Sequence, residues 1–357
     1  MQKILIVNEV CSDNIGDHAI NEGIRKVVSD AGYIAESVGF DAGKKNVKSQ
    51  PVKKNTKVSF VRRVRHYIFW KNQFVKYTRW YINNIKRIRN VFVDNYGAMI
   101  IGGGQLIQSG GTFPIAMYIW SREAKKNKIP FYIVGVGCAE KFTKIDKWLY
   151  KKAFSYSSGF FVREKKSIEK IESFFSVKPG YIPDLAYALY DEHSTIEIKK
   201  KNISIVGATA YYVHKKNIDE INAVDEGDFE SYVSYWINII EKEIQTGNVV
   251  QLVSTTVEDA DLNKFIYDKI ICDENKNYIN LIENVPSINE YLSHLKDAKV
   301  VYSGRMHTLI LGHINNCQLS PAILSKKIEY YMHEYSSLSA MDLKRKVYET
   351  VQVNLLQ

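Results

Sequence analysis

The stretch that decides the fold is KILIVNEVCSDNIGD, residues 3–17. Its first part, Lys3–Asn8, is a continuous apolar run, as in a strand buried on both faces of a sheet. The polar loop Cys11–Gly16 follows, and a helical pattern then extends from about Asp17 to Asp30. A buried strand that leads through a short loop into a helix predicts one unit of a parallel α/β sheet.

The same alternation continues along the rest of the chain, in two series. The first series has further strands predicted at Tyr33–Phe40, Ala98–Ile101, Pro130–Val136 and Gly159–Val162. The second has strands predicted at Asn202–Gly207, Asn248–Ser254, Tyr278–Ile282, Lys299–Tyr302 and Leu319–Leu324, with helices at 229–246, 259–271, 287–295 and 306–314. Each series predicts one Rossmann-like, doubly wound domain, and the economical arrangement is two such domains that face a cleft.

The length of the chain also favours two domains, because 357 residues exceed one ordinary hydrophobic core. We predict a first domain at 1–190 that contains a basic helical insertion at 52–93. A polar linker at 191–201 leads to a second domain at 202–330, and a helical tail occupies 331–357.

The insertion concentrates the positive charge of the chain. Between Asp41 and Asp94 there are fifteen Lys and Arg and no acidic residue, whereas the rest of the chain is slightly acidic. An apolar stripe also recurs there every seven residues, which predicts one long helix or a helical hairpin: Phe60, Tyr67, Phe74, Tyr81 and Ile88. A basic helix with such a stripe suits an anionic membrane surface, and we predict docking through residues 57–93. Packing of the stripe on the enzyme's own core or on a partner subunit is the alternative that the sequence leaves open.

The remaining composition indicates a reduced, cytoplasmic protein, held peripherally at the inner face of the membrane by the basic segment. The four cysteines lie far apart with no C-x-x-C pair, so neither a disulfide framework nor a zinc site is expected. No apolar run reaches the roughly 20 residues that span a bilayer, and the start has no secretory pattern. The histidines show no metal-ligand spacing, so we expect no metal. Without a recognisable nucleic-acid module, nucleic acid is not an expected partner.

Three polar loops follow predicted strands and are candidates for a site: Asn14–Asp17, Gly102–Gln105 and Ser303–His307. A glycine triplet lets backbone N–H groups approach an anion or a sugar, although a tight turn is the plain alternative. The third loop starts a helix with Arg305 and His307 in its first turn, where free N–H groups and the helix dipole attract anions. Arginine adds a bidentate donor for phosphate or carboxylate.

Taken together, the motifs of the chain resemble the polysaccharide pyruvyl transferase family. The motifs are N-x-G-D, G-G-G-Q, G-V-G, F-V-R-E, P-D and S-G-R-M-H, found here at Asn14–Asp17, Gly102–Gln105, Gly135–Gly137, Phe161–Glu164, Pro183–Asp184 and Ser303–His307. The resemblance spans residue 4 to about residue 330. It implies a GT-B-like fold, phosphoenolpyruvate as donor substrate with no cofactor, and a glycan or lipid-linked saccharide as acceptor. The implied product is a pyruvate ketal in a capsule, exopolysaccharide or cell-wall polymer.

The resemblance also implies roles for single residues. Arg163 and Arg305 would bind the donor, one from each domain; a surface ion pair with Glu164 or Glu169 is the plain alternative for Arg163. Imidazole titrates near neutral pH, so His307 is the expected acid. Asp17 would act as base or hold a sugar hydroxyl, although an Asp at a helix start is also a routine cap. The other predicted substrate-binding residues are Asn14, Gly16, Gly102, Gly103, Gly104, Gln105, Ser303, Gly304, Met306 and Lys326.

Some features depart from the family pattern or stay ambiguous. The basic segment is not part of the pattern, and the chain differs from it after His307, which makes Lys326 or Lys327 the candidate lysine. Asp184 is expected to be a turn or cap residue. Two other functions remain open: a GT-B glycosyltransferase that uses a nucleotide sugar, and a non-catalytic, membrane-associated scaffold of a glycan pathway.

Overall fold

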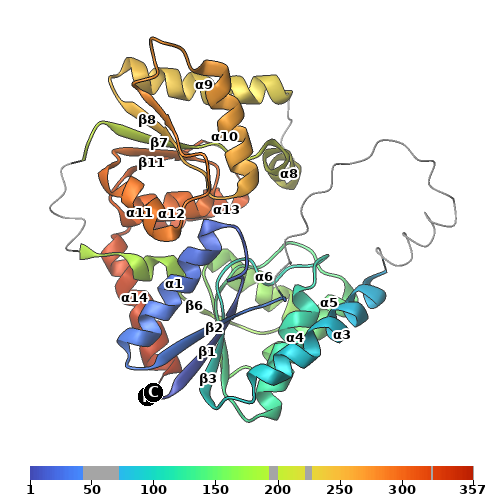
Figure 1. Ribbon diagram of the computed structural model, residues 1–357. Helices are drawn as coiled ribbons and strands as arrows, with labels where there is room; N and C mark the ends of the chain where they lie inside the picture. The colour runs from blue at the N-terminus through green and yellow to red at the C-terminus, as the bar shows by residue number, and fades with distance from the viewer. Residues whose placement is uncertain (43–71, 193–199, 222–226, 323–324, 357) are drawn as a thin grey trace, which may run out of the picture. The chain divides into compact units, whose positions relative to one another are not determined.

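The computed structural model describes residues 1–42, 72–192, 200–221, 227–322 and 325–356 (Figure 1). The chain forms two compact units. Unit 1 comprises Met1–Cys11, Val27–Ile182 and Thr350–Gln357, and unit 2 comprises Ser12–Lys26 and Pro183–Glu349. Each unit contains one parallel sheet, which confirms the prediction of two Rossmann-like α/β domains. Of the helices in the described residues, none is both long and apolar enough to cross a membrane.

Unit 1 contains a sheet of six parallel strands in the order β2-β1-β3-β4-β5-β6. The residues from Ile4 to Val7 are at most 2% exposed, because the neighbouring strands and the helices on both faces exclude water from this run. The order of the strands reverses between β1 and β3, which makes the carboxyl ends of these two strands a topological switch point. The bounds are β1 (Lys3–Asn8), β2 (Ile34–Gly39), β3 (Tyr96–Gly102), β4 (Phe131–Val136), β5 (Gly159–Val162) and β6 (Gly180–Tyr181).

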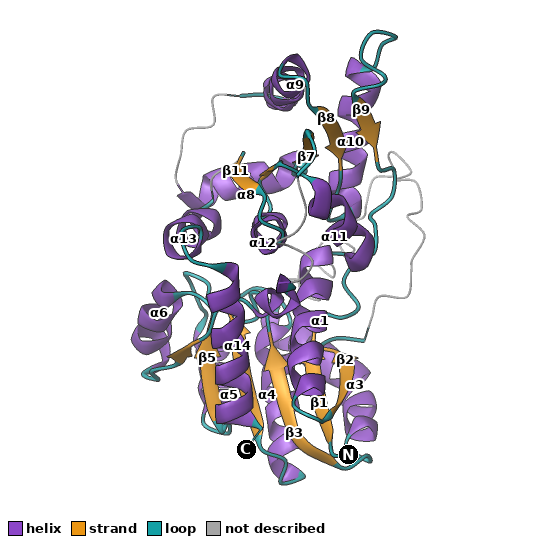
Figure 2. Ribbon diagram, turned by 90° about the vertical axis from the view of Figure 1, so that its left-hand side faces the viewer, coloured by secondary structure: helices purple, strands orange, loops and turns teal. Residues whose placement is uncertain are grey.

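The helices that supply the core of unit 1 are rich in aromatic residues. Trp120 and Tyr150 are fully buried, and Tyr150, Phe154 and Phe175 form a cluster of rings with centroids 5.2 to 5.8 Å apart. Figure 2 shows the strands enclosed by helices. The bounds are α1 (Ile15–Asp30), α3 (Gln73–Val91), α4 (Phe113–Lys126), α5 (Lys144–Phe154), α6 (Lys165–Phe175) and α14 (Ala340–Leu355); α1 and α14 each belong partly to unit 2.

Unit 2 contains a sheet of five parallel strands in the order β11-β10-β7-β8-β9, with its switch point between β7 and β10. The strands are β7 (Ile203–Gly207), β8 (Val249–Leu252), β9 (Ile279–Leu281), β10 (Val300–Ser303) and β11 (Gln318–Pro321). The helices are α8 (Tyr211–Ile221), α9 (Phe229–Gln245), α10 (Val257–Ile270), α11 (Ile288–Asp297), α12 (Met306–Ile314) and α13 (Lys326–Tyr335), with the 3-10 helix η1 (Leu185–Leu189).

The units do not coincide with the predicted domains 1–190 and 202–330. Residues 12–26 belong to unit 2, since the Ile15 N–H donates to the Thr255 carbonyl at 3.0 Å and Gly23 packs on the Leu185 carbonyl. The predicted tail is also divided, and its end belongs to unit 1, where the Tyr33 hydroxyl donates to the Leu356 carbonyl. Most of the predicted linker, residues 193–199, lies outside the described residues.

The predicted basic insertion is described only from residue 72 onward, as α3. Phe60 and Tyr67 lie outside the described residues. Ile88 is buried and Tyr81 packs on the core, so the packing alternative is right for these two residues, whereas Phe74 is 72% exposed. Residues seven apart drift by about 20° around a straight helix, so a seven-residue repeat does not stay on one face. The fully buried face follows a different spacing: Tyr77, Trp80, Asn84 and Ile88.

All four cysteines are free, which agrees with the absence of a predicted disulfide framework. Cys138 and Cys317 are buried, and burial raises the pKa of these thiols to about 12 and about 11.

The contact of α1 with η1 predicts an unusual cost for a helix-favouring substitution. Gly to Ala in a helix ordinarily stabilises by about 0.5–1 kcal/mol. A Cβ on Gly23, however, would lie 2.1 Å from the Leu185 carbonyl oxygen, a backbone atom with no room to rotate away. We expect Gly23→Ala to lower the free energy of unfolding by about 1–3 kcal/mol, measured by thermal and denaturant unfolding.

The matched control is Ser29→Ala, on the exposed side of the same helix. It should leave stability unchanged or slightly higher. If Gly23→Ala unfolds at the same temperature as Ser29→Ala, the packing of α1 on η1 is wrong.

Candidate functional site

The candidate site of unit 2 is built at the carboxyl edge of its sheet, at the switch point between β7 and β10. Ser303 ends β10; its hydroxyl donates to the Gly207 carbonyl at the end of β7 and accepts the Arg305 N–H, both at 3.1 Å. Ser303 is fully buried, as is Gly304 beside it. Ser303 therefore shapes the loop after β10, and the binding role predicted for it stays a prediction.

The Arg305 side chain is held by a buried carboxylate. Its Nε and Nη2 donate to Asp259 Oδ2 and Oδ1 at 2.9 and 2.7 Å, and Nη2 also reaches Thr256 Oγ1 at 3.3 Å. Asp259 is 1% exposed. Burial alone would lower the pKa of Arg305, but the hydrogen bonds and charge of Asp259 raise it above its ordinary value. The guanidinium is thus fixed in orientation, and neither bond to Asp259 uses Nη1.

His307 lies in the first turn of α12, against the first turn of α1. A Cβ on Gly16 would lie 2.3 Å from His307 Nδ1, so only glycine lets the start of α1 approach the imidazole this closely. On the other side of the ring, Asp184 Oδ2 lies 3.5 Å from His307 Nε2. That nitrogen is buried and has no hydrogen-bond partner among the described residues. Buried polar atoms ordinarily have partners, so this one is a candidate for contact with a ligand.

A second histidine on the same helix shows the contrast. His313 Nδ1 lies 2.9 Å from the Tyr187 hydroxyl, and burial lowers the pKa of His313. The Nδ1 of His313 is therefore bonded within the protein, whereas the Nε2 of His307 has no hydrogen-bond partner among the described residues.

The loop before α1 is fixed by its own hydrogen bonds. Asn14 Oδ1 accepts the Gly16 N–H at 2.9 Å, and the Asn14 carbonyl accepts the Asp17 N–H at 3.0 Å. Asn14 therefore folds the loop back so that Gly16 reaches His307. Asp17, the predicted base, is half-buried in the first helical turn, one residue after the glycine that contacts the imidazole.

Asp184 combines two roles, of which the sequence predicted one. Its Oδ1 accepts the Ala186 N–H at 3.0 Å and so caps η1, as expected. Its other oxygen is the one that faces His307. Because Asp184 is 3% exposed, its carboxylate is well placed to orient the imidazole.

In unit 1, the glycine triplet joins two strands. The Gly103 N–H donates to the Val134 carbonyl, and the Gly104 carbonyl accepts the Gly137 N–H, both at 2.9 Å. Gly103 and Gly104 have φ of 76° and 72°, a region that favours glycine. The Gly103 N–H is thus used within the protein and is not the free anion donor that we predicted. Gln105, after the triplet, is half-buried.

Arg163 lies at the end of β5, also in unit 1. It is 3% exposed, and its Nε lies 3.4 Å from Glu164 Oε1. Glu164 Oε2 accepts the Ser167 hydroxyl at 2.8 Å, so the pair is anchored from the helix that follows. The ion pair with Glu164 therefore exists, but it is buried and not on the surface.

The other predicted positions are less informative. Met306 is half-buried at the start of α12, and Lys326 is half-buried at the start of α13. The described residues contain no cluster of three or more His, Cys, Asp or Glu side chains that could hold a metal ion.

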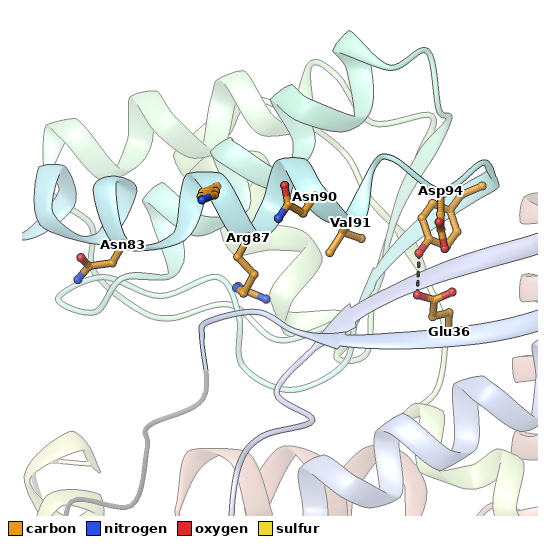
Figure 3. A pocket seen from close by; sticks show the side chains of 8 residues that line it. Glu36, Asn83, Arg87, Asn90, Val91 and Asp94 are labelled. Carbon is orange, nitrogen blue, oxygen red and sulfur yellow. Dashed lines mark hydrogen bonds between the residues drawn. The ribbon is translucent and has the colours of Figure 1, made fainter.

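An open hollow of about 630 Å³ lies beside α3 in unit 1 (Figure 3), and none of the predicted site residues lines it. Two of its lining side chains bond within the protein: Arg87 donates to the Gly39 and Phe40 carbonyls, and Tyr96 donates to Glu36. We therefore assign no site to this hollow.

Sequence reasoning missed the two residues that hold the Arg305 guanidinium in place. Asp259 and Thr256 were not singled out, because T-x-x-D before an apolar pattern is a routine helix start. The Thr256 hydroxyl does cap α10 by accepting the Asp259 N–H at 3.3 Å. Only the fold brings the same two side chains to Arg305.

Comparison with known proteins gives one family and a set of distant structures. The profile of the family described as polysaccharide pyruvyl transferase matches residues 14–319. No curated protein shows significant sequence similarity to the chain.

Among solved structures, S. aureus MnaA with UDP aligns at a TM-score of 0.52 and 11% identity, over 98% of this chain and 91% of that chain. The UDP-N-acetylglucosamine 2-epimerase from Rickettsia bellii aligns at 0.48 and 10%, over 100% and 96% of the two chains. The likeness to the first structure shows a shared GT-B-type fold and carries nothing about substrate.

The contact between Gly16 and His307 leads to a prediction that needs no activity assay. Gly16→Ala must push the imidazole aside, since the new Cβ would also lie 2.6 Å from His307 Cγ. In protein with labelled histidine, we expect the NMR signals of the His307 ring to move, while the protein stays folded because the ring can rotate.

Gly111→Ala is the matched control, since its Cβ would meet only the Phe113 ring, at 3.2 Å. It should leave the His307 signals in place. Unmoved signals in Gly16→Ala would contradict the close approach of the loop to the ring.

Proposed function

The chain belongs to the polysaccharide pyruvyl transferase family, and we propose that it transfers the enolpyruvyl carbons of phosphoenolpyruvate to a glycan or lipid-linked saccharide. The product is a pyruvate ketal of a capsule, exopolysaccharide or cell-wall polymer, and phosphate is released. The observation that carries the proposal is the position of Ser303–His307: this motif lies at the switch point of a doubly wound sheet, where such folds bind ligands.

The proposed reaction has three steps. A proton adds to the methylene carbon of phosphoenolpyruvate, which leaves positive charge on the central carbon. One sugar hydroxyl then attacks that carbon, loses its proton, and the phosphate departs. A second hydroxyl of the same sugar attacks in turn and loses its proton, which closes the ketal.

His307 is proposed to deliver the first proton. Its buried Nε2 has no hydrogen-bond partner among the described residues, which supports a role toward a bound substrate. Asp184 is proposed as a positioning residue, because its Oδ2 lies 3.5 Å from His307 Nε2, close enough to act on the ring although the two atoms are not hydrogen-bonded. Asp17 is proposed to accept the proton of a sugar hydroxyl, since it follows Gly16, the residue that meets the imidazole.

Donor binding is proposed to combine Arg305 with the start of α12. The Arg305 side chain is held by Asp259 through Nε and Nη2. These two bonds fix the plane of the guanidinium and therefore the position of Nη1, which takes part in neither bond. Among the side chains that the structure describes, none caps the N-terminus of α12, in contrast to α10, α11 and α13, which Thr256, Ser287 and Ser325 cap. An uncapped helix N-terminus offers N–H groups to an anion. Arg163 is proposed as the donor-binding arginine of unit 1, and no cofactor enters the proposal.

The alternative is a GT-B glycosyltransferase that uses a nucleotide sugar. Its only support is the shared fold, which at 11% identity does not extend to the substrate. The family match, by contrast, covers most of the chain. We therefore propose pyruvyl transfer, and the two functions are distinguished by which donor substrate the protein uses.

The reaction is tested by incubating the full chain with phosphoenolpyruvate and a panel of saccharide acceptors. We expect one acceptor to gain the mass of pyruvic acid less one water, with one phosphate released for each product formed. Phosphoenolpyruvate should also raise the unfolding temperature, because a ligand that binds only the folded state stabilises it. Stabilisation and product formation with a UDP-sugar instead would replace the proposal by the glycosyltransferase alternative.

The acid and its positioning residue are tested by kinetics. His307→Ala should lower kcat at least about a hundredfold, the usual scale for an acid–base group. Asp184→Asn keeps an oxygen to cap η1 and should lower kcat by about tenfold or more while changing the shape of its pH profile.

His333→Ala is the matched control, because His333 is exposed on α13 of the same unit. Near wild-type turnover in folded His307→Ala would remove the acid role. An unchanged pH profile in Asp184→Asn would reduce Asp184 to a helix cap.

A further inference from the structure

We propose that the outer face of α3, α4 and α5 in unit 1 is a docking surface for an anionic lipid bilayer. The three helices pack on the sheet through a common apolar core, and α4 lies between α3 and α5 (Figure 1). Their outer sides carry both of the features that bind such a surface, which are exposed apolar side chains and a large excess of positive charge.

The apolar side chains are exposed to an unusual degree. Phe74 and Ile82 on α3 are 72% and 66% exposed, and Ile145 and Trp148 on α5 are 45% and 54% exposed. None of these four side chains lies in the core, which Tyr77, Trp80, Tyr150 and Phe154 help to fill. Trp is a favoured anchor at the level of lipid headgroups, because its ring is apolar and its N–H is polar.

Contacts between rings make the surface continuous across the three helices. Trp148 of α5 packs on Tyr118 of α4, with ring centroids 5.8 Å apart. Arg122 of α4 lies 5.9 Å from the centroid of Tyr118 and 5.7 Å from that of Tyr81 on α3. Tyr118 and Arg122 of α4 therefore connect Trp148 of α5 to Tyr81 of α3, and the exposed side chains lie on these neighbouring helices.

The positive charge of these helices favours an anionic partner. Between Asn72 and Phe160 the chain has fourteen Lys and Arg against four acidic residues, and two of the four, Glu123 and Asp146, are buried. On α5, Lys144, Lys151 and Lys152 are exposed around Trp148, at spacings that place them on one side of the helix. A positive surface with protruding rings complements a layer of anionic headgroups over an apolar interior.

The surface differs from the membrane segment expected from the sequence. That expectation rested on residues 57–93, of which those up to 71 lie outside the described residues, and it did not include α4 or α5. The described surface stands on these two helices and α3. It does not rest on the proposed transferase activity, since no residue of the candidate site belongs to it.

The test is co-sedimentation of the full chain with vesicles of phosphatidylcholine alone or mixed with phosphatidylglycerol, at low and high salt. A triple variant changes Lys144, Lys151 and Lys152 to Glu, and a second variant is Trp148→Ser. The matched control places the same three charge reversals on unit 2, at Lys264, Lys276 and Lys296, which are exposed. Variants are compared at equal folded fraction, measured by thermal unfolding.

We expect the wild type to bind the anionic vesicles, to bind neutral vesicles at least about tenfold less, and to be released by salt. The triple variant on α5 should bind about a hundredfold less tightly, Trp148→Ser less tightly than wild type, and the unit 2 control within about threefold of it. Equal binding by the α5 triple variant and the control overturns the proposal. So does failure of the wild type to bind anionic vesicles. Tight binding of a labelled single-stranded oligonucleotide that the α5 triple variant loses would then make the surface a nucleic-acid site.

Discussion

A carboxylate that is removed from water must have its oxygens satisfied, and Asp259 meets this requirement by joining the loops of the second sheet. Its Oδ1 accepts the Arg305 guanidinium and the Ala210 N–H, at 2.7 and 2.9 Å. Its Oδ2 accepts the guanidinium and the Thr255 hydroxyl, at 2.9 and 3.2 Å. These groups follow β7, β8 and β10, so one buried charge fixes three loops. Removing one partner of such a pair costs about 3–5 kcal/mol, which makes the arrangement rigid.

This rigidity sets the position of the groups that face the substrate in our proposal. Arg305 precedes α12 and His307 lies one residue into it, so an Arg305 locked by Asp259 also fixes the start of the helix. The Thr255 carbonyl holds the loop before α1 through the Ile15 N–H. Gly16 then meets the imidazole from the loop side, and Asp184 meets it from the side of η1. The imidazole therefore lies between the start of α1 and one carboxylate.

The sequence predicted the parallel sheets, because uninterrupted apolar runs such as Lys3–Asn8 have few other solutions. It also singled out Gly16, Arg305 and His307 through motif and strand-end position, and the structure brings Gly16 and His307 into contact. The role of Asp259 was not readable, since a Thr-x-x-Asp start looks the same whether or not an arginine approaches it. The hydrogen bond of the Gly103 N–H to β4 was not readable, because a glycine triplet has the same sequence whether its N–H groups face a ligand or a neighbouring strand. Phe74 was grouped with Tyr81 because a seven-residue repeat ignores the drift of a straight helix.

Unit 2 is discontinuous in sequence, and this affects how the protein is made. Its first piece, residues 12–26, buries Ile15, Ala19, Ile20 and Ile24, yet the unit's other piece begins only at Pro183. At about 5–20 residues per second, the ribosome needs on the order of 15–60 s after Lys26 to reach His307. For that interval residues 12–26 remain without the other piece of unit 2. The four buried side chains of this segment therefore become enclosed only after residues 27–182 of unit 1 have been synthesised.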